Sequence, residues 1–318
     1  MLPIAVDAMG GDKAPDDIVT GAELATKEGL PVVLVGDEAR LSSLTDLPIV
    51  ASSEVIEMGD EPASAVRAKK DSSVVVANKL VADGHASAVI SAGNTGAALA
   101  SSLLKLGRIK GVSRPTIAVP FPTITDTPTT LVDTGANADC KAPWLIQFGK
   151  LGTIYQRRRY GIEKPRLGVL TIGEEAGKGN ALIKETCQLA EKTDWSTVGA
   201  DFIGNIEGHD FLDGSVDVVI ADGFTGNVVL KSLEGMFELF KQETNAYLQD
   251  IGGAREAVVP MFKKYDPVTV GTGVLLGLKH ISMIAHGSSS PQAIANTIRT
   301  ANELLSLDMV DVQRTELA

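Results

Sequence analysis

Short runs of consecutive apolar residues recur along the chain, and helix-like segments separate them. The runs do not alternate polar with apolar positions, which is typical of parallel strands buried on both faces of a sheet. Strands that alternate with helices indicate a doubly wound α/β sheet. The predicted strands are Ile4–Val6, Val32–Val35, Ala88–Ser91, Thr130–Val132, Leu167–Thr171, Val216–Ala221 and Ile281–Ala285. The predicted helices span residues 14–28, 73–83, 95–107, 141–157, 179–192, 226–250 and 291–306.

One uncharged stretch, Ala86–Leu104, is long enough to be considered as a membrane span. Its centre carries the polar and glycine residues Gly93, Asn94, Thr95 and Gly96, which do not suit a continuous apolar helix. We therefore predict a strand, a loop and a helix in this stretch.

Polar, glycine-rich loops follow most of the predicted strands. Ligands of open α/β sheets bind beyond the carboxyl ends of the strands, and a helix that starts there offers unpaired N–H groups to a phosphate. A single loop of this kind is most often a tight turn, but a series of them favours a polar, anionic ligand. The loops are DAMGGD (7–12), SAGNTG (91–96), DTGANAD (133–139), IGEEAGKGN (172–180), DGFTGN (222–227) and AHGSSS (285–290).

Composition narrows the function classes. The 318 residues suit one large α/β domain or two ordinary ones. The formal net charge of −11 and the aromatic content of 4% argue against binding to nucleic acid.

Cys140 and Cys187 show neither metal-ligand spacing nor a disulfide framework, which favours a reducing cytoplasm. Asp7 interrupts the first apolar run, so we expect no signal peptide. Because the standard nucleotide and metal motifs are missing, we expect a phosphate ligand and no cofactor or metal.

A series of motifs in order along nearly the whole chain resembles one family closely. It is the bacterial acyl-phosphate synthase family, the acyl-ACP:phosphate acyltransferases of phospholipid synthesis, where ACP is acyl carrier protein. The motifs are IAVDAMGGDKAP (4–15), DEPASAVRAKKDSS (60–73), ISAGNTGA (90–97), GRIKGVSRP (107–115), DTGANAD, GKGN with KET (184–186), FIGNIEG (202–208), DGFTGNVVLK (222–231) and AHGSS.

The resemblance implies a homodimer with a Rossmann-like α/β/α fold. We expect residues 1–318 of each chain to form a single α/β catalytic domain. The resemblance also implies that long-chain acyl-ACP and inorganic phosphate give acyl phosphate and ACP. The acyl phosphate would then feed a membrane glycerol-3-phosphate acyltransferase. Two alternatives stay open: a short-chain phosphate acyltransferase that uses CoA, and a non-catalytic sensor of acyl-ACP.

Such a reaction needs positioning and hydrogen-bond donors more than covalent catalysis, because phosphate is the nucleophile and a thiolate is a fair leaving group. On residue type alone, Lys184 reads as a solvated helix lysine and Asn227 as a plain N-cap or a side-chain donor. The resemblance favours a catalytic role for both residues. Cysteine is a residue type that can form an acyl-cysteine intermediate, but for Cys187 a small core residue is the better interpretation.

Other donors of the glycine-rich loops are candidates for binding phosphate. His286 is as well explained by a structural role as by a phosphate contact. Gly10 and Gly11 would shape the crevice beside the two carboxylates of the first loop, whose side chains would orient cationic or hydroxyl groups or cap the next helix. The phosphate-binding candidates are Gly10, Gly11, Asn94, Thr95, Asn137, His286 and Ser288.

ACP is strongly acidic, so an acidic enzyme must offer it a local basic patch. The run Arg157, Arg158 and Arg159 is one candidate, with residues 67–70 and 108–114 as others, although a charge run is usually a solvated surface.

Residues 233–264 predict a helical hairpin, with an apolar stripe on its first helix. The tip, residues 251–262, is apolar enough to dip into a bilayer or to pack on a dimer partner. We expect a cytoplasmic protein with peripheral attachment at the inner face of the cell membrane.

Overall fold

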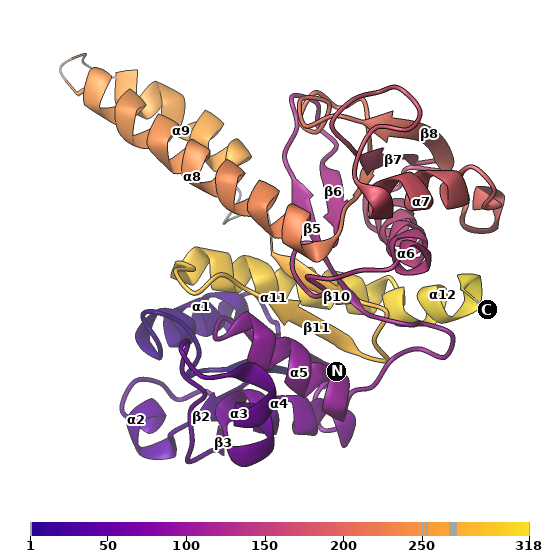
Figure 1. The fold of residues 1–318 in the computed structure, drawn as a ribbon. Helices are drawn as coiled ribbons and strands as arrows, with labels where there is room; N and C mark the ends of the chain where they lie inside the picture. Colours follow the sequence, from indigo (N-terminus) through magenta and orange to yellow (C-terminus); the bar gives the residue numbers. More distant parts are fainter. Residues whose placement is uncertain (1, 250, 252–253, 267–271, 318) are drawn as a thin grey trace. The chain divides into compact units, whose positions relative to one another are not determined.

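The computed structural model describes residues 2–249, 251, 254–266 and 272–317 (Figure 1). The chain forms two compact units. Unit 1 comprises Met1–Pro115 and Thr272–Ala318, and unit 2 comprises Thr116–Gly271. The expectation of one catalytic domain over residues 1–318 stays a prediction.

Unit 1 is built on a mostly parallel sheet. Strand β1 pairs in parallel with β2 on one side and with β4 on the other, and β4 pairs in parallel with β11. Strand β10 runs antiparallel to β11. In spatial order the strands are β3 (Ile49–Ala51), β2 (Val32–Gly36), β1 (Ile4–Asp7), β4 (Ala88–Ser91), β11 (Ile281–Ile284) and β10 (Gly273–Leu276).

Helices cover this sheet, and two of them pack closely because one carries a glycine. A Cβ atom at Gly21 of α1 would lie 2.6 Å from Cβ of Ile294 on α11, so only glycine allows this approach. The helices of unit 1 are α1 (Asp16–Lys27), α2 (Glu38–Ser42), α3 (Pro62–Ala68), α4 (Ser73–Ala82), α5 (Thr95–Lys105), α11 (Pro291–Ser306) and α12 (Met309–Glu316).

Unit 2 repeats the plan with five strands among its described residues. Strands β6, β9, β7 and β8 are parallel neighbours, and β5 runs antiparallel to β6. Their order is β5 (Thr116–Phe121), β6 (Thr129–Val132), β9 (Val218–Ile220), β7 (Arg166–Leu170) and β8 (Asp201–Ile206). The helices are α6 (Ala142–Tyr160), α7 (Ala181–Ala190), the short 3₁₀ helix η1 (Trp195–Val198), α8 (Gly223–Tyr247) and α9 (Ala254–Tyr265).

The predicted α/β class is confirmed, and every predicted strand and helix has a counterpart. Strands β1, β2, β4, β6, β9 and β11 are buried throughout, as their continuous apolar sequences indicate. The stretch Ala86–Leu104 folds as β4, a glycine loop and most of α5, as predicted. Among the described residues, no helix combines the length and the apolar character that crossing a membrane requires.

Helices α8 and α9 form the predicted hairpin, and Figure 1 shows them side by side in orange. The rings of Phe237 on α8 and Phe262 on α9 meet edge to face, with centroids 6.0 Å apart. Helix α8 starts at Gly223, well before the expected hairpin start at residue 233. Residues 252–253 of the predicted tip lie outside the described residues.

Candidate functional site

Three glycine-rich loops of unit 1 come together at the carboxyl edge of its sheet. They follow β1, β4 and β11, which are adjacent and parallel, so their carboxyl ends share one edge. The N–H of Asp12 donates to the carbonyl of Gly287 over 2.8 Å. A Cβ atom at Gly10 would lie 2.8 Å from the nitrogen of Gly93, so the first two loops touch through glycine backbone.

Asp7 is buried beneath these loops, with 2% of its surface exposed. Its carboxylate accepts the hydroxyl of Ser91 at 2.7 Å and the N–H of Met9 at 3.3 Å. Burial raises the pKa of Asp7, while these hydrogen bonds oppose the rise. The carboxylate therefore orients a hydroxyl, as the sequence suggested. Asp12 does not cap the next helix, because α1 begins after Pro15 without a side-chain cap.

The other candidates in the first two loops differ in how they are engaged. Asn94 caps α5 by accepting the N–H of Ala97 at 3.0 Å, and its amide donates to the carbonyl of Met58 at 3.1 Å. Thr95 is exposed on the first turn of α5. Gly11 has φ of +125°, a conformation that glycine adopts most readily. Phosphate binding by these residues stays a prediction.

His286 and Ser288 are joined in the loop after β11. The ring Nδ1 lies 2.7 Å from the Ser288 hydroxyl and accepts the Ser288 N–H at 3.2 Å. Because Nδ1 acts as an acceptor for a backbone N–H, a neutral ring carries its proton on Nε2. Phosphate binding by His286 and Ser288 stays a prediction.

In unit 2, the loop after β6 is organised around the buried carboxylate of Asp133. It accepts the N–H groups of Ile117 at 2.9 Å, Ala136 at 3.1 Å and Asn137 at 2.7 Å, and the side-chain amide of Asn137 at 2.9 Å. Burial raises the pKa of Asp133, and these hydrogen bonds oppose the rise. The amide of Asn137 is thus engaged within its own loop.

The start of α8 packs on this loop and carries Asn227. Asp222 is the N-cap, accepting the N–H of Thr225 at 2.9 Å, so the interpretation of Asn227 as an N-cap is wrong. Asn227 instead donates its amide to the carbonyl of Thr134 at 3.1 Å. A Cβ atom at Gly226 would lie 1.9 Å from the Asp133 carbonyl oxygen. Asn137 and Asn227, which were predicted separately, therefore contact the same loop.

Lys184 is exposed on α7, whose N-cap is Asn180. Three residues later, the thiol of Cys187 donates to the side-chain oxygen of Asn205 at 3.1 Å. Burial, followed by the charge of Glu191, raises the pKa of Cys187. A protonated, hydrogen-bonded thiol favours the structural interpretation of this cysteine. Burial likewise raises the pKa of Cys140 to about 11.

Arg157 holds α6 to a neighbouring segment, whereas Arg159 contacts two tyrosines of α6 itself. Arg157 donates to the carbonyl of Val198 at 3.0 Å. The guanidinium of Arg159 lies over the ring of Tyr160, 5.1 Å from its centroid, and donates to the hydroxyl of Tyr155. Arg158 is exposed. A role of this run in binding ACP stays a prediction.

One group of described residues has metal-ligand spacing. Ligand atoms of Glu174, His209 and Asp210 lie within 4.8 Å of one another. Glu174 and His209 are exposed, and the Asp210 carboxylate already accepts the N–H of Glu207 at 2.8 Å. Exposed ligands with a competing hydrogen bond make a weak metal site.

Sequence reasoning missed two residues of unit 2, one that organises the loop after β6 and one that caps α8. Asp133 and Asp222 stand first in the loops DTGANAD and DGFTGN, but the sequence did not tell which of their polar residues are buried. The signal was their position directly after a buried strand, where a side-chain acceptor can satisfy the N–H groups of the turn or helix that follows.

Comparisons with known proteins place the chain among acyl-transferring enzymes. A family model described as "Fatty acid synthesis protein" matches residues 2–312. The phosphate acyltransferase of Pelotomaculum thermopropionicum is 44% identical, over 99% of this chain and 95% of that protein. The phosphate acyltransferase of Elusimicrobium minutum is 43% identical, over 100% of this chain and 96% of that protein.

Solved structures share the fold at low sequence identity. A phosphotransacetylase from Streptococcus pyogenes superposes with a TM-score of 0.63 and 15% identity, covering 98% of this chain and 94% of that chain. A branched-chain phosphotransacylase from Enterococcus faecalis gives 0.62 and 16%, covering 95% and 98%.

Proposed function

We propose a function for this chain, which belongs to the acyl-phosphate synthase family and is an acyltransferase. The family model that matches it is the one described as a fatty acid synthesis protein. The curated relatives of this chain are phosphate acyltransferases that match it along nearly its whole length. Transfer of an acyl group to phosphate is therefore the activity of the family. The acyl donor and the fate of the product are finer points that we assign below.

We infer that the acyl donor is long-chain acyl-ACP and that the products are acyl phosphate and free ACP. The observation that carries this proposal is the likeness to phosphate acyltransferases along nearly the whole chain, at 44% and 43% identity. The acyl phosphate then feeds a membrane glycerol-3-phosphate acyltransferase in phospholipid synthesis. The alternative is a short-chain enzyme that uses CoA. The solved phosphotransacylases are only 15–16% identical to this chain, so they support the fold alone and do not decide the donor.

The chemistry we propose is direct attack on the thioester. A phosphate oxygen adds to the acyl carbon, the C–O bond forms, and the C–S bond breaks. The electron pair leaves on the ACP thiolate, which then takes up a proton. Catalysis consists of holding the two reactants together and of stabilising the oxyanion that develops on the thioester oxygen.

The residues take separate roles in this proposal. Lys184 supplies positive charge and Asn227 a side-chain amide donor to the reacting groups, and both are exposed. The amide of Asn227 is already held by the Thr134 carbonyl, which fixes its orientation. The residues that we assign to phosphate are Gly10, Gly11, Asn94, Thr95, Asn137, His286 and Ser288.

Asp7 and Asp133 are buried carboxyl groups. Burial raises the pKa of both, while hydrogen bonds to their carboxylates oppose the rise. Each carboxyl also organises groups of its own loop: the hydroxyl of Ser91 for Asp7, and backbone N–H groups for Asp133. Their proposed role is to shape the loops.

We further propose that the enzyme is a cytoplasmic homodimer that docks acidic ACP through Arg157, Arg158 and Arg159. It attaches peripherally to the inner face of the cell membrane through residues 251–262 of the hairpin. Ile251 and Val259 support this attachment, because 55% and 44% of their surfaces are exposed. An amphiphilic product bound for a membrane enzyme gives such contact a purpose.

A panel of donors tests the proposed reaction. Thiol release is measured from palmitoyl-ACP, palmitoyl-CoA and acetyl-CoA, each with and without phosphate. We expect release that depends on phosphate and is fastest with palmitoyl-ACP. Preference for acetyl-CoA would favour the short-chain alternative, and release that ignores phosphate would refute phosphate acyl transfer. Binding of acyl-ACP without release would indicate a sensor.

A further inference from the structure

One carboxylate of the loops that we assign to phosphate has no task in the account so far. It belongs to Asp12, the last residue of the loop after β1, whose side chain is exposed. Asp7, at the start of the same loop, is buried and accepts the hydroxyl of Ser91, and helix α1 does not use Asp12 as a cap. Because a carboxylate repels a bare anion, its presence in a loop assigned to phosphate needs a physical reason.

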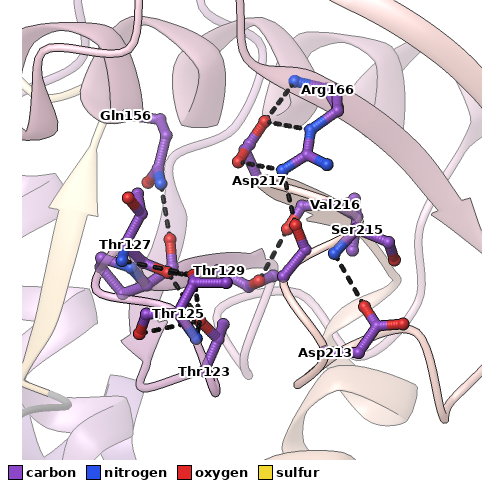
Figure 2. A network of polar contacts seen from close by, with 12 residues as sticks. Thr123, Thr125, Thr127, Thr129, Gln156, Arg166, Asp213, Ser215, Val216 and Asp217 are labelled. Atoms are coloured by element: carbon purple, nitrogen blue, oxygen red, sulfur yellow. Dashed lines mark hydrogen bonds and ion pairs between the residues drawn. The ribbon is translucent and has the colours of Figure 1, made fainter.

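Acidic side chains in other parts of the chain are engaged by partners of their own. Figure 2 shows two examples from unit 2. Asp217 is paired with Arg166 at 2.9 Å, and Asp213 accepts the N–H of Ser215 at 2.7 Å. Each of these carboxylates is explained by the structure that it stabilises.

The acids that follow Asp12 in the chain also have cationic partners. The carboxylate of Asp17 lies 3.6 Å from Nζ of Lys13, and that of Asp16 lies 4.0 Å from a guanidinium nitrogen of Arg40. Asp12 differs from them, since no residue that the structure describes gives its carboxylate a hydrogen bond or an ion pair. Its acceptor atoms are therefore available to a ligand.

The side chain of Asp12 lies against the loop after β11. Its backbone N–H donates to the carbonyl of Gly287 at 2.8 Å. A Cβ atom at Gly287 would lie 3.0 Å from Oδ1 and 3.5 Å from Oδ2 of Asp12, so the carboxylate sits beside this glycine. Gly287 stands between His286 and Ser288, which are two of the residues that we assign to phosphate.

The loop after β4 reaches the same place through Gly11, the residue before Asp12. A Cβ atom at Gly11 would lie 3.4 Å from the carbonyl oxygen of Gly287 and 3.5 Å from Cβ of Ala92. Backbone from three loops thus converges next to Asp12. An anion held where these loops meet lies within reach of its carboxylate.

The chemistry of a carboxylate limits which anion suits this position. A carboxylate only accepts hydrogen bonds, so its ligand must donate one. Near neutral pH, inorganic phosphate keeps at least one hydrogen on its oxygens. Sulfate has the shape and the charge of monohydrogen phosphate but carries no hydrogen, so it would bring one acceptor against another. A site built to hydrogen-bond a substrate hydroxyl strongly rejects an analogue that lacks it.

We propose that Asp12 selects phosphate over anions without a hydrogen, by accepting a hydrogen bond from the O–H of the bound phosphate. The inference rests on the proposed function, because it adds a specificity residue to the same phosphate site. The charge of the acceptor strengthens this bond, which offsets the repulsion between the carboxylate and the anion. The hydrogen stays on the phosphate, and an unprotonated oxygen remains to attack the thioester.

Three substitutions separate this role from the charge of the region. Asp12→Asn removes the charge and supplies an N–H that sulfate can accept, and Asp12→Ala removes the acceptor without supplying a donor. Asp16→Asn is the matched control, since it makes the same change of charge at an exposed acid four residues later. Circular dichroism and urea unfolding verify that each variant folds.

Anion binding is measured without an acyl donor, so it does not depend on turnover. The width of the ³¹P NMR line of inorganic phosphate reports its exchange with the enzyme, and arsenate or sulfate is added as a competitor at constant ionic strength. Arsenate keeps a hydrogen as phosphate does. In the wild type, we expect arsenate to compete at least ~30-fold more strongly than sulfate, the scale of one hydrogen bond to a charged group.

The variants should change this ratio in different ways. In Asp12→Asn and Asp12→Ala, the two competitors should come within about threefold of each other, chiefly because sulfate binds more tightly. Asp16→Asn should keep the wild-type ratio, because its side chain lies outside the three loops.

Several results would overturn the proposal. Equal competition by arsenate and sulfate in the wild type is one, and a wild-type ratio in both Asp12 variants is another. If Asp12→Asn strengthens both competitors by the same factor, the carboxylate only repels anions in general. Loss of selectivity in Asp16→Asn would assign the effect to the charge of the whole region, and a phosphate line that the wild type does not broaden would refute the site itself.

Turnover then distinguishes this inference from the proposed function. With palmitoyl-ACP as donor and phosphate near its KM, sulfate should inhibit Asp12→Asn at least ~10-fold more strongly than the wild type. A wild type that binds phosphate selectively but releases no ACP contradicts the proposed function and supports the role of Asp12. Release that depends on phosphate, with equal inhibition by sulfate in the wild type and Asp12→Asn, contradicts the role of Asp12 alone.

Discussion

Two glycines of α8 should respond in opposite directions to the same substitution. A Cβ atom at Gly226 would lie 1.9 Å from the carbonyl oxygen of Asp133, whereas real Cβ contacts essentially never fall below 3.0 Å. The first turns of α8 and the loop after β6 would have to separate by about 1 Å. At Gly235, in the same helix, an added Cβ meets nothing within 4 Å.

The magnitudes follow from three terms. Overpacking against backbone costs about 3 kcal/mol, the upper part of the usual range. Loss of the Asn227–Thr134 hydrogen bond costs about 1 kcal/mol more, and alanine's helix propensity returns about 1 kcal/mol. Gly226→Ala should therefore lower the free energy of unfolding of unit 2 by about 3 kcal/mol. Gly235→Ala should raise it by about 0.5–1 kcal/mol, because only the propensity term applies.

Tryptophan fluorescence in urea measures this difference selectively. Both tryptophans of the chain, Trp144 and Trp195, belong to unit 2, so their emission follows the unfolding of that unit. For a slope of about 2 kcal/mol per molar, the urea midpoint should fall by about 1.5 M in Gly226→Ala and rise by about 0.4 M in Gly235→Ala. If the two midpoints shift together, or if Gly226→Ala is as stable as the wild type, the close packing of α8 on the Asp133 loop is wrong.

Four further predictions concern the chemistry and the membrane. Lys184→Ala and Asn227→Ala should each lower kcat by at least ~100-fold with the fold intact, the scale of losing an oxyanion donor, and Asn227→Ala should also lose about 1 kcal/mol of stability with its hydrogen bond to Thr134. Kinetics within tenfold of the wild type would contradict their catalytic roles. Cys187→Ser should keep most of the activity, and a folded but inactive variant would point to an acyl-cysteine instead. Only the thiolate form of a cysteine reacts with iodoacetamide. Because burial raises the pKa of Cys140 to about 11, its thiol should react over ~100-fold more slowly than free cysteine at pH 8. The rate should rise about tenfold per pH unit until the pH approaches the pKa. Val259→Asp should reduce flotation of the protein with phospholipid vesicles, and equal flotation of variant and wild type would refute attachment through the hairpin tip.

The apolar runs predicted the central strands because burial on both faces leaves a continuous apolar signature. Two of the strands that the sequence did not indicate, β5 and β8, have weaker signatures. Strand β5 contains Pro120, which is unfavourable inside a sheet, and partners an antiparallel neighbour. Strand β8 is partly exposed, and its register with β7 is irregular just before Gly204, whose φ is +92°. These strands depend on tertiary pairing more than on local pattern.

The candidate site was predictable in outline but not in its connections. Loop position after a buried strand marked segments that lie together at the ends of the strands, because that rule depends on topology alone. The contacts could not be read from sequence, since Asn227 finds its acceptor 93 positions earlier, at Thr134. Its assignment as an N-cap failed because Asp222 starts the helix sooner than the apolar pattern indicates. The apolar stripe of the hairpin was visible in the sequence, but the apolar pocket beside the hairpin is also lined by Phe121 and Leu212, which come from distant segments.

The measurement that tests the central claim most directly follows the phosphate itself. Purified enzyme is mixed with palmitoyl-ACP and phosphate labelled with ¹⁸O at all four oxygens, and the products are resolved by mass spectrometry. The account predicts one palmitoyl phosphate for each ACP thiol released, with all four labelled oxygens retained, because a phosphate oxygen forms the new bond to the acyl carbon. Release of unlabelled palmitate in place of labelled acyl phosphate would contradict it.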